Sequence, residues 1–184
     1  MKALTKAFLG LALVTCSLAA SAQTKDPLVG GAAMYPTKTI FENAVKSPIH
    51  KTLVSAVKDA GLADTLNGPG PFTVFAPTDD AFAKLPHGTV DNLMQPENKS
   101  TLTKILTYHV VPGRISSSDL KTWIKKGNGK YELKTVEGGM LTVSMSGSNI
   151  VLTDEKGGTA TITIPDVFQS NGVIHVINAV LMPK

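Results

Sequence analysis

The sequence predicts an α+β domain with a largely antiparallel sheet. Segments with helical periodicity come first, up to Val111, whereas short strands separated by glycine-containing turns follow Lys130. Helices that precede the strands, rather than alternating with them, argue against a doubly wound parallel sheet. A third observation is Gly172–Pro183, GVIHVINAVLMP, which is apolar on both faces and therefore predicts a strand that is buried on both sides.

The first 22 residues have the pattern of a secretory signal peptide. Lys2 and Lys6 give it a positive start, Ala7–Ala20 is apolar but too short to span a bilayer, and Ala20-Ser21-Ala22 is a small-x-small cleavage site. We therefore expect an exported, periplasmic or extracellular protein that keeps 162 of the 184 residues after cleavage near Ala22. No later segment approaches the roughly 20 apolar residues of a membrane helix, so we expect no transmembrane segment.

The single cysteine, Cys16, lies inside this N-terminal segment. Leu13-Val14-Thr15-Cys16 is a weak match to a bacterial lipoprotein box, which would make Cys16 a lipidated N-terminus. Cleavage after Ala22 is the alternative, and it leaves a chain without a thiol. Such a chain has no disulfide, no thiolate metal site and no cysteine nucleophile.

Charge and basic residue type both argue against a nucleic-acid partner. Loss of Lys2 and Lys6 lowers the formal net charge by two, from +4 to +2, which is no nucleic-acid signature. Arg114 is the only arginine, so bidentate contacts to phosphate or carboxylate are barely available.

The first third of the chain predicts a loose lead followed by two helices. Residues 23–33 are polar and rich in glycine, and we expect them to be loose. Helices are expected over Thr37–Lys46 and then from Ser47 to Gly61. In the second helix Ser47 is the expected N-cap, Pro48 suits the first turn, and Gly61 is the C-terminal stop.

A buried strand over Phe72–Ala76 leads into the best helix N-cap of the chain, Thr78. The Thr78 hydroxyl can accept a hydrogen bond from an orphan backbone N–H, and Asp79 and Asp80 lie where the helix dipole favours negative charge. A shared acid–base or metal site of the two carboxylates is the other interpretation. It is disfavoured because adjacent helix residues point about 100° apart.

A third helical run is expected over Lys99–Val111, and strands follow it. The expected strands are Tyr131–Val136, Met140–Met145, Ile150–Asp154, Thr159–Ile164 and Val173–Met182.

Three segments resemble, in order, the motifs of fasciclin-type (FAS1) domains. Phe72–Pro86, FTVFAPTDDAFAKLP, resembles the first signature and Gly172–Pro183 the second, while Leu106–Gly113, LTYHVVPG, is similar to the tyrosine–histidine segment between them. The resemblance implies a FAS1 domain over residues 34–184. It also implies the FAS1 fold, a wedge of two small, mainly antiparallel sheets packed with a cluster of N-terminal and central helices.

The resemblance further implies an extracellular module for cell adhesion or matrix contact, with no catalytic residue, cofactor or metal. The expected partner is a surface glycan, a matrix component or a protein. Many animal members contain several copies, whereas this chain has one, so bridging two surfaces requires a homo-oligomer or two binding faces. The alternative is a small-ligand carrier with a groove between the helices and the wedge. An enzyme ranks third, because the chain lacks G-x-S-x-G, H-E-x-x-H, Walker A and calcium-loop motifs.

Tyr108 and His109 are the first candidates for interaction, because the resemblance connects this pair with receptor binding in animal relatives. His109 continues the apolar stripe of its helix, which favours a hydrogen-bonded core histidine, and Tyr108 falls on a more polar flank. His175 and Asn178 are placed among aliphatic residues of the last strand, which favours structural roles. Many relatives have aspartate where this chain has Asn178, so a role that needs charge there is in doubt.

One segment interleaves the only tryptophan, Trp123, with lysines. Its cations are Lys121, Lys125, Lys126, Lys130 and Lys134. The ordinary interpretation is a solvated charged face with Trp123 partly buried. The functional interpretation, centred on Trp123, Lys125 and Lys126, is a patch for an anionic glycan, a lipid headgroup or an acidic protein.

Overall fold

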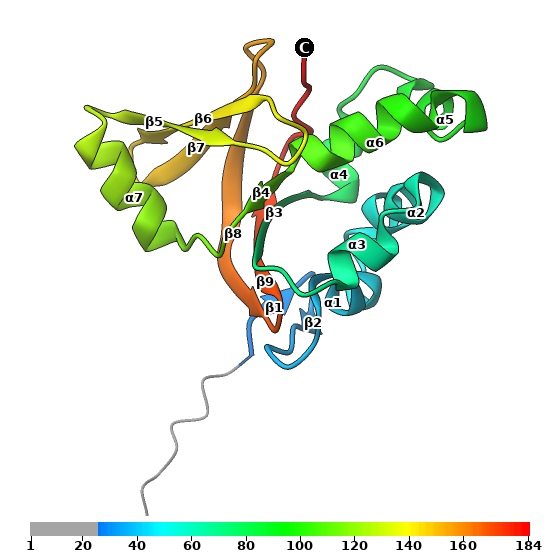
Figure 1. Ribbon diagram of the computed structural model, residues 1–184, viewed down its shortest axis with the longest axis horizontal. Coiled ribbons are helices and arrows are strands. Elements are labelled where there is room, and N and C mark those ends of the chain that lie inside the picture. The colour runs from blue at the N-terminus through cyan, green and yellow to red at the C-terminus, as the bar shows by residue number, and fades with distance from the viewer. Residues whose placement is uncertain (1–25) are drawn as a thin grey trace, which may run out of the picture.

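A seven-stranded sheet in the order β4-β3-β9-β8-β7-β6-β5 runs through the computed structural model, which describes residues 26–184 (Figure 1). The predicted signal peptide and Cys16 lie outside the described residues. The strands are β3 (Phe72–Pro77), β4 (Val110–Pro112), β5 (Lys130–Lys134), β6 (Met140–Ser146), β7 (Asn149–Thr153), β8 (Thr159–Gln169) and β9 (Gly172–Ile177). The β3–β9 pair is parallel and the other pairs are antiparallel, which confirms the predicted class.

The long strand β8 joins the two halves of this sheet. Its first residues pair with β7, and the rest pairs with β9 through register shifts on either side of Ile164. Asp166 lies in the second irregularity with a left-handed backbone, φ 58°. Bulges of this kind bend a strand. The sheet therefore divides into β4-β3-β9-β8 and β8-β7-β6-β5, which form the wedge.

Helices cover the two halves from opposite sides (Figure 1). They are α1 (Ile40–Lys46), α2 (Lys51–Ala60), α3 (Ala63–Asn67), α4 (Asp79–Ala83), α5 (Thr89–Leu93), α6 (Lys99–Tyr108) and α7 (Ser117–Lys126), with a short 3₁₀ turn at Pro96–Asn98. Helices α1 to α6 gather on one side, and α7 lies on the other beside β5 to β7. Within residues 26–184, no helix combines the length and the apolar character that crossing a membrane requires.

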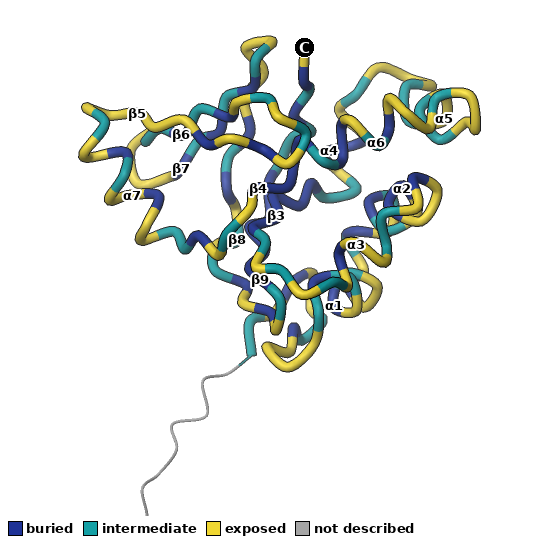
Figure 2. Tube along the Cα trace, viewed as in Figure 1, coloured by how far each residue is buried: buried dark blue, intermediate teal, exposed yellow. Residues whose placement is uncertain are grey.

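Two apolar clusters form the core. One lies between the helices α1 to α6 and the strands β3 and β9, and the other lies between α7 and the β5–β8 half. Figure 2 shows the buried stretches concentrated where the central strands meet. All six residues of β9 are buried, which confirms the strand predicted to be apolar on both faces.

The second helix begins later than the sequence pattern predicts. It starts at Lys51, and Ser47 instead ends α1, with an extended backbone at φ −75° and ψ 122°. Ser47 is separated from α2 by a turn at Pro48 and Ile49, and His50 takes the N-cap position of α2. The Ser47 hydroxyl hydrogen-bonds Nδ1 of His50 at 2.7 Å.

Several further boundaries differ from prediction, and for α6 the cause is tertiary pairing. The helix α6 ends at Tyr108 instead of Val111, because Val110 and Val111 pair with the edge of β3. The last strand ends at Ile177 instead of Met182. Helix α7 was not predicted from the sequence pattern at all.

Part of the lead that was expected to be loose is packed. The strands β1 (Leu28–Val29) and β2 (Ala32–Ala33) form a two-stranded sheet, and Val29 is only 2% exposed. Gly30 turns the chain with φ +61°, and a Cβ there would lie 2.8 Å from Ile49. The hairpin is therefore fitted against the segment before α2.

Thr78 caps α4 as predicted, and its neighbour Asp79 does more than support the dipole of its own helix. The Thr78 hydroxyl accepts the Ala81 N–H at 3.3 Å. The Asp79 carboxylate accepts the backbone N–H groups of Thr52 at 2.8 Å and Lys51 at 3.3 Å. These are the first two residues of α2, which has no side-chain cap of its own. Asp79 therefore caps a helix that lies elsewhere in the sequence.

We predict that Asp79→Ala lowers the free energy of unfolding by about 1–2 kcal/mol, because two N–H groups at the start of α2 lose their acceptor. Chemical denaturation of the variant and the parent measures this difference. Asp80→Ala is the matched control, since Asp80 is exposed. Equal losses in the two variants would contradict the capping role.

Candidate interaction surface and its buried supports

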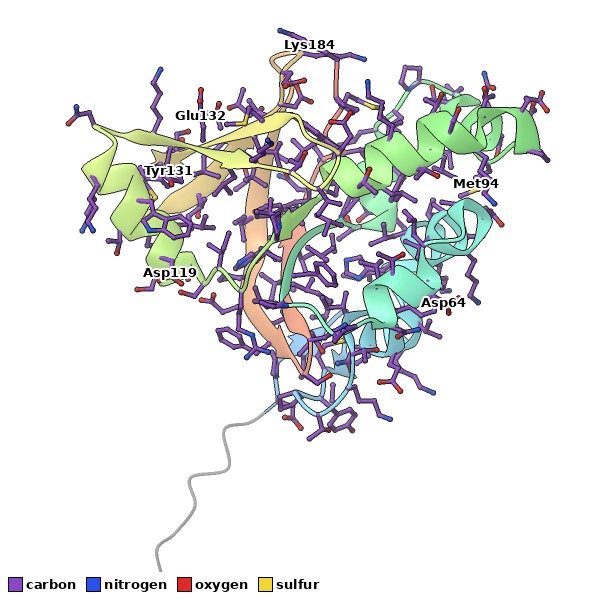
Figure 3. The ribbon with its side chains drawn as sticks, viewed as in Figure 1. Asp64, Met94, Asp119, Tyr131, Glu132 and Lys184 are labelled. Carbon is purple, nitrogen blue, oxygen red and sulfur yellow. The ribbon has the colours of Figure 1, made fainter. Side chains whose placement is uncertain are left out.

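An aromatic pair on α7 and β5 forms the most distinctive surface feature of the predicted patch. The rings of Trp123 and Tyr131 lie with their centroids 5.2 Å apart and their planes at 37°. Tyr131 is 40% exposed and Trp123 is half-buried. Figure 3 shows Tyr131 on β5, next to α7. The pair therefore presents an amphipathic ring surface to solvent.

The local sequence explains why these two rings meet. Helix α7 begins at a reciprocal capping box between Ser116 and Asp119, and it buries Leu120 and Ile124. The turn at Gly127–Gly129, which includes Asn128 at φ 55°, then reverses the chain into β5. This reversal lays Tyr131 over the exposed flank of α7.

The predicted lysines do not all accompany Trp123. At about 100° per residue, Lys126 lies about 60° from Trp123 around α7, whereas Lys125 lies about 160° away. Lys121 belongs with Lys125, one turn earlier. Helix geometry therefore separates Lys121 and Lys125 from the Trp123 flank of α7.

Strand alternation separates the remaining two lysines from the ring pair. Lys130 and Lys134 both project from the face of β5 opposite to Tyr131, because side chains alternate along a strand. The surface that the structure brings together consists of Trp123, Tyr131 and Lys126, which we call the α7–β5 ring surface. Tyr131 was not among the predicted residues, although its spacing of eight from Trp123 across a glycine turn is a detectable signal.

Tyr108 is fully buried, contrary to its expected position on a polar flank. Its hydroxyl donates a hydrogen bond to the carbonyl of Met140 at 2.7 Å and accepts one from the N–H of Glu155 at 3.2 Å. Burial raises the pKa of Tyr108 to about 12, so the phenol stays protonated at neutral pH. Through these two hydrogen bonds Tyr108 joins α6 to the start of β6 and to the segment after β7.

His109 is also buried, and both of its ring nitrogens are occupied. Nδ1–H donates to the carbonyl of Ile105 at 2.9 Å, and Nε2 accepts the N–H of Leu181 at 3.1 Å. This arrangement requires a neutral ring. Burial lowers the pKa of His109 to about 4. The side chain therefore ties α6 to the C-terminal segment and is not available to a partner at the surface.

His175 performs a similar task on β9. Its Nε2–H donates to the carbonyl of Ile115 at 2.9 Å, and its Nδ1 accepts the N–H of Asp166 at 3.2 Å. The ring stacks on Phe75, with centroids 5.7 Å apart. Burial lowers the pKa of His175 and favours the neutral form. The side chain thus fixes both the bulge of β8 and the loop before α7.

Asn178 pins the end of β9 to β8 without a charge. Its side-chain Oδ1 accepts the N–H of Thr161 at 2.8 Å, and its own N–H donates to the carbonyl of Thr161 at 3.2 Å. An amide oxygen makes the same contact that a carboxylate would make. The asparagine is therefore compatible with the structural role.

The C-terminal segment is held by side-chain acceptors that the sequence pattern did not reveal. The Met182 N–H donates to the carboxylate of Asp154 at 2.8 Å, and the Lys184 N–H donates to Glu155 at 3.3 Å. Asp154 is buried and also accepts the N–H of Gly158 at 2.7 Å. No sequence signal links these acceptors to residues about thirty positions later.

A separate apolar cavity of about 50 Å³ lies among the helices α1, α2, α3 and α6 and the strands β3, β4 and β9. Of the residues that line it, only Thr65, Thr107 and His109 are polar. The cavity lies where the carrier interpretation places a groove.

Within residues 26–184, no group of three or more His, Cys, Asp or Glu side chains is arranged to hold a metal ion.

Comparisons with known proteins find a matching family and similar sequences. A family model described as the Fasciclin domain matches residues 48–183. Protein sll1483 from Synechocystis is 45% identical over 159 residues, which cover 86% of this chain and 81% of that protein. Cell surface glycolipoprotein MPB83 from Mycobacterium bovis is 35% identical over 170 residues, covering 90% of this chain and 68% of that protein.

The fold is similar to that of a solved FAS1 domain pair from the insect cell adhesion molecule fasciclin I. The TM-score is 0.72 at 22% sequence identity. The match covers 80% of this chain and 51% of the domain pair, so this chain spans about half its length. The predicted wedge fold is thereby confirmed.

We predict that His175→Ala lowers the free energy of unfolding by about 2–4 kcal/mol, because the partly buried Asp166 N–H and the buried Ile115 carbonyl lose their partners. Asn178→Ala should cost about 1–2 kcal/mol through the unpaired Thr161 N–H. Thermal unfolding measures both, and the exposed Asn149→Ala is the control. An unchanged Tm in either core variant would refute its structural role.

We predict that acid weakens the fold through its buried histidines. The pKa of His109 is about 4 in the fold and about 6.5 in the unfolded chain, so its contribution is complete above pH 6.5 and decreases as the pH falls toward 4. Between pH 6.5 and 4.5 the free energy of unfolding should fall by about 2–3 kcal/mol from His109, and His175 adds to the loss in the same direction.

Denaturation at several pH values in this window measures the slope. The pKa values of Glu42, Asp119 and Glu155 are lowered by hydrogen bonds from backbone or serine groups, so these carboxylates affect stability below the window. His109→Gln should flatten the slope, and the exposed His87→Gln is the matched control. An equally steep slope in His109→Gln would contradict the assignment.

Proposed function

The chain belongs to the fasciclin (FAS1) domain family, and on this premise we propose that it is a secreted, non-catalytic interaction module that binds cell surfaces. The names of two similar proteins support the proposal, since one is an insect cell adhesion molecule and another is a cell surface glycolipoprotein. Export through the N-terminal segment, with cleavage near Ala22, is part of the proposal. Adhesion or matrix contact is the corresponding role.

The α7–β5 ring surface carries this proposal. Rings of tyrosine and tryptophan supply large contact areas with little loss of side-chain entropy, and a nearby lysine attracts an anion. Lys126 lies on the Trp123 flank of α7, where its charge is exposed. We therefore propose an anionic glycan of the cell surface as the partner.

The buried pair Tyr108 and His109 affects the proposed binding only indirectly. Both side chains are nearly inaccessible, with exposed fractions of 0% and 3%. A substitution at either position would change binding through the stability of the fold. A homo-oligomer remains the proposed means by which one domain bridges two surfaces.

Carriage of a small ligand is a second candidate, and one observation favours it. The apolar cavity among α1–α3, α6 and the strands β3, β4 and β9 is partly enclosed by side chains from several elements. Small-molecule sites are generally concave and mostly apolar.

We predict that a Trp123→Ala and Lys126→Ala double variant binds an immobilised anionic glycan at least about tenfold more weakly than the parent, because ring contacts and one cation are lost together. Surface plasmon resonance against heparin and intact cells measures the change. Lys121→Ala with Lys125→Ala is the matched control, since it removes more positive charge from the opposite flank of α7.

The two variants separate a located surface from simple charge attraction. A larger loss in the Lys121/Lys125 variant would contradict the ring surface, and so would equal binding by the parent and the Trp123/Lys126 variant. Unchanged thermal unfolding in both variants establishes that binding, and not folding, was altered.

A further inference from the structure

We propose that the apolar cavity binds the unbranched aliphatic chain of a small, uncharged molecule that is dissolved and not part of a membrane. This inference rests on the second function proposed above and names the chemistry of the ligand. It concerns a part of the molecule remote from the α7–β5 ring surface (Figure 1).

The walls of the cavity select against a charged or strongly polar ligand. None of its lining residues is an acid, a lysine or an arginine. The hydroxyl of Thr107 already donates to the carbonyl of Thr103 at 2.7 Å, and both ring nitrogens of His109 have partners. Burying an unpaired polar group costs free energy. The third polar residue, Thr65, is exposed to solvent, so a ligand finds almost only apolar contacts inside.

The volume of the cavity favours a slender chain over a ring. About 50 Å³ is several times the roughly 10–15 Å³ that one water molecule requires, but it is well below the roughly 150 Å³ of a cavity that accommodates benzene. The cavity therefore has room for a few methylene groups entering end-on.

Accessible apolar side chains mark the mouth of the cavity. Its inner wall is formed by buried residues such as Leu53 and Val57, whereas Phe41 and Val54 are half-buried and Val136 is 46% exposed. An aliphatic chain passing this rim would cover apolar surface that now faces solvent.

The charges next to the mouth compensate each other. Glu137, the neighbour of Val136, forms an ion pair with Lys104 at 3.7 Å. Lys104 in turn lies one helical turn before Thr107 in α6. Since this pair carries no net charge, the Val136 side of the rim gives no electrostatic advantage to an ionised head group. An uncharged head group is the matching chemistry.

The test is a titration of the full chain with straight-chain primary alcohols from butanol to decanol. Amide chemical shifts in ¹H–¹⁵N spectra report the affinity and the residues involved. Each additional methylene should raise the affinity about fourfold until the cavity is filled, after which the increase should stop. The shifts should centre on α1, α2 and β3.

Val54→Phe is designed to fill the cavity from α2, and it should weaken the binding of the best alcohol at least tenfold. Val45→Phe is the matched control, because Val45 is exposed on α1 and does not line the cavity. Ala44→Leu fills the cavity from α1 and serves as the second variant if Val54→Phe does not fold.

Absence of alcohol binding would overturn the inference. So would alcohol binding by both filled variants that is as strong as that of the parent, or binding of the chain to phosphatidylcholine vesicles but not to free alcohols. The Trp123/Lys126 variant should bind alcohols normally, while the filled variants should retain glycan binding. If the protein binds the glycan but not the alcohols, only this inference is therefore refuted. The reverse result refutes only the proposed ring surface.

Discussion

Burial of β9 on both faces is the constraint on which the rest of the structure depends. A strand in this position has no water to satisfy its polar groups, so each one needs a partner inside the protein. Its backbone pairs with β3 on one side and β8 on the other, and the ring of His175 makes two hydrogen bonds at its centre. Because β8 continues past β9 to reach β7, the same strand order also holds the two halves of the wedge together.

Neutral histidines and carboxylates secure the segments that the sheet does not pair. His109 holds the C-terminal segment through Leu181, and Asp154 holds it through Met182. Asp79 secures the start of α2 in the same manner. These side chains substitute for backbone partners where the chain is irregular. The tyrosine–histidine pair of this family motif is thus explained by packing, since both side chains are buried.

The two candidate binding regions lie in different layers of the fold. The ring surface belongs to α7 and β5, whereas the cavity belongs to α1–α3, α6 and the β4-β3-β9 edge (Figure 1). They are built over different core clusters, since Trp123 packs against the cluster beside α7 and the cavity residues belong mostly to the other. Changes in one region therefore leave the packing of the other largely intact, and a surface-binding module and a carrier are compatible within one domain.

The sequence by itself determined the class of fold, the buried last strand and the Thr78 cap, because periodicity, glycine turns and capping depend on neighbouring residues. It also indicated the family through Phe72–Pro86 and Gly172–Pro183. Only the tertiary structure decided the distant pairings. It ended α6 at Tyr108 by pairing Val110 with β3, and it assigned Asp79 to α2. It also showed that Tyr131, rather than the expected Lys125, lies beside Trp123, since helix phase and a chain reversal together determine which side chains meet. Contacts between residues far apart in sequence leave no periodic signal, and for that reason the cavity and the acceptors of the C-terminal segment became visible only in the folded chain.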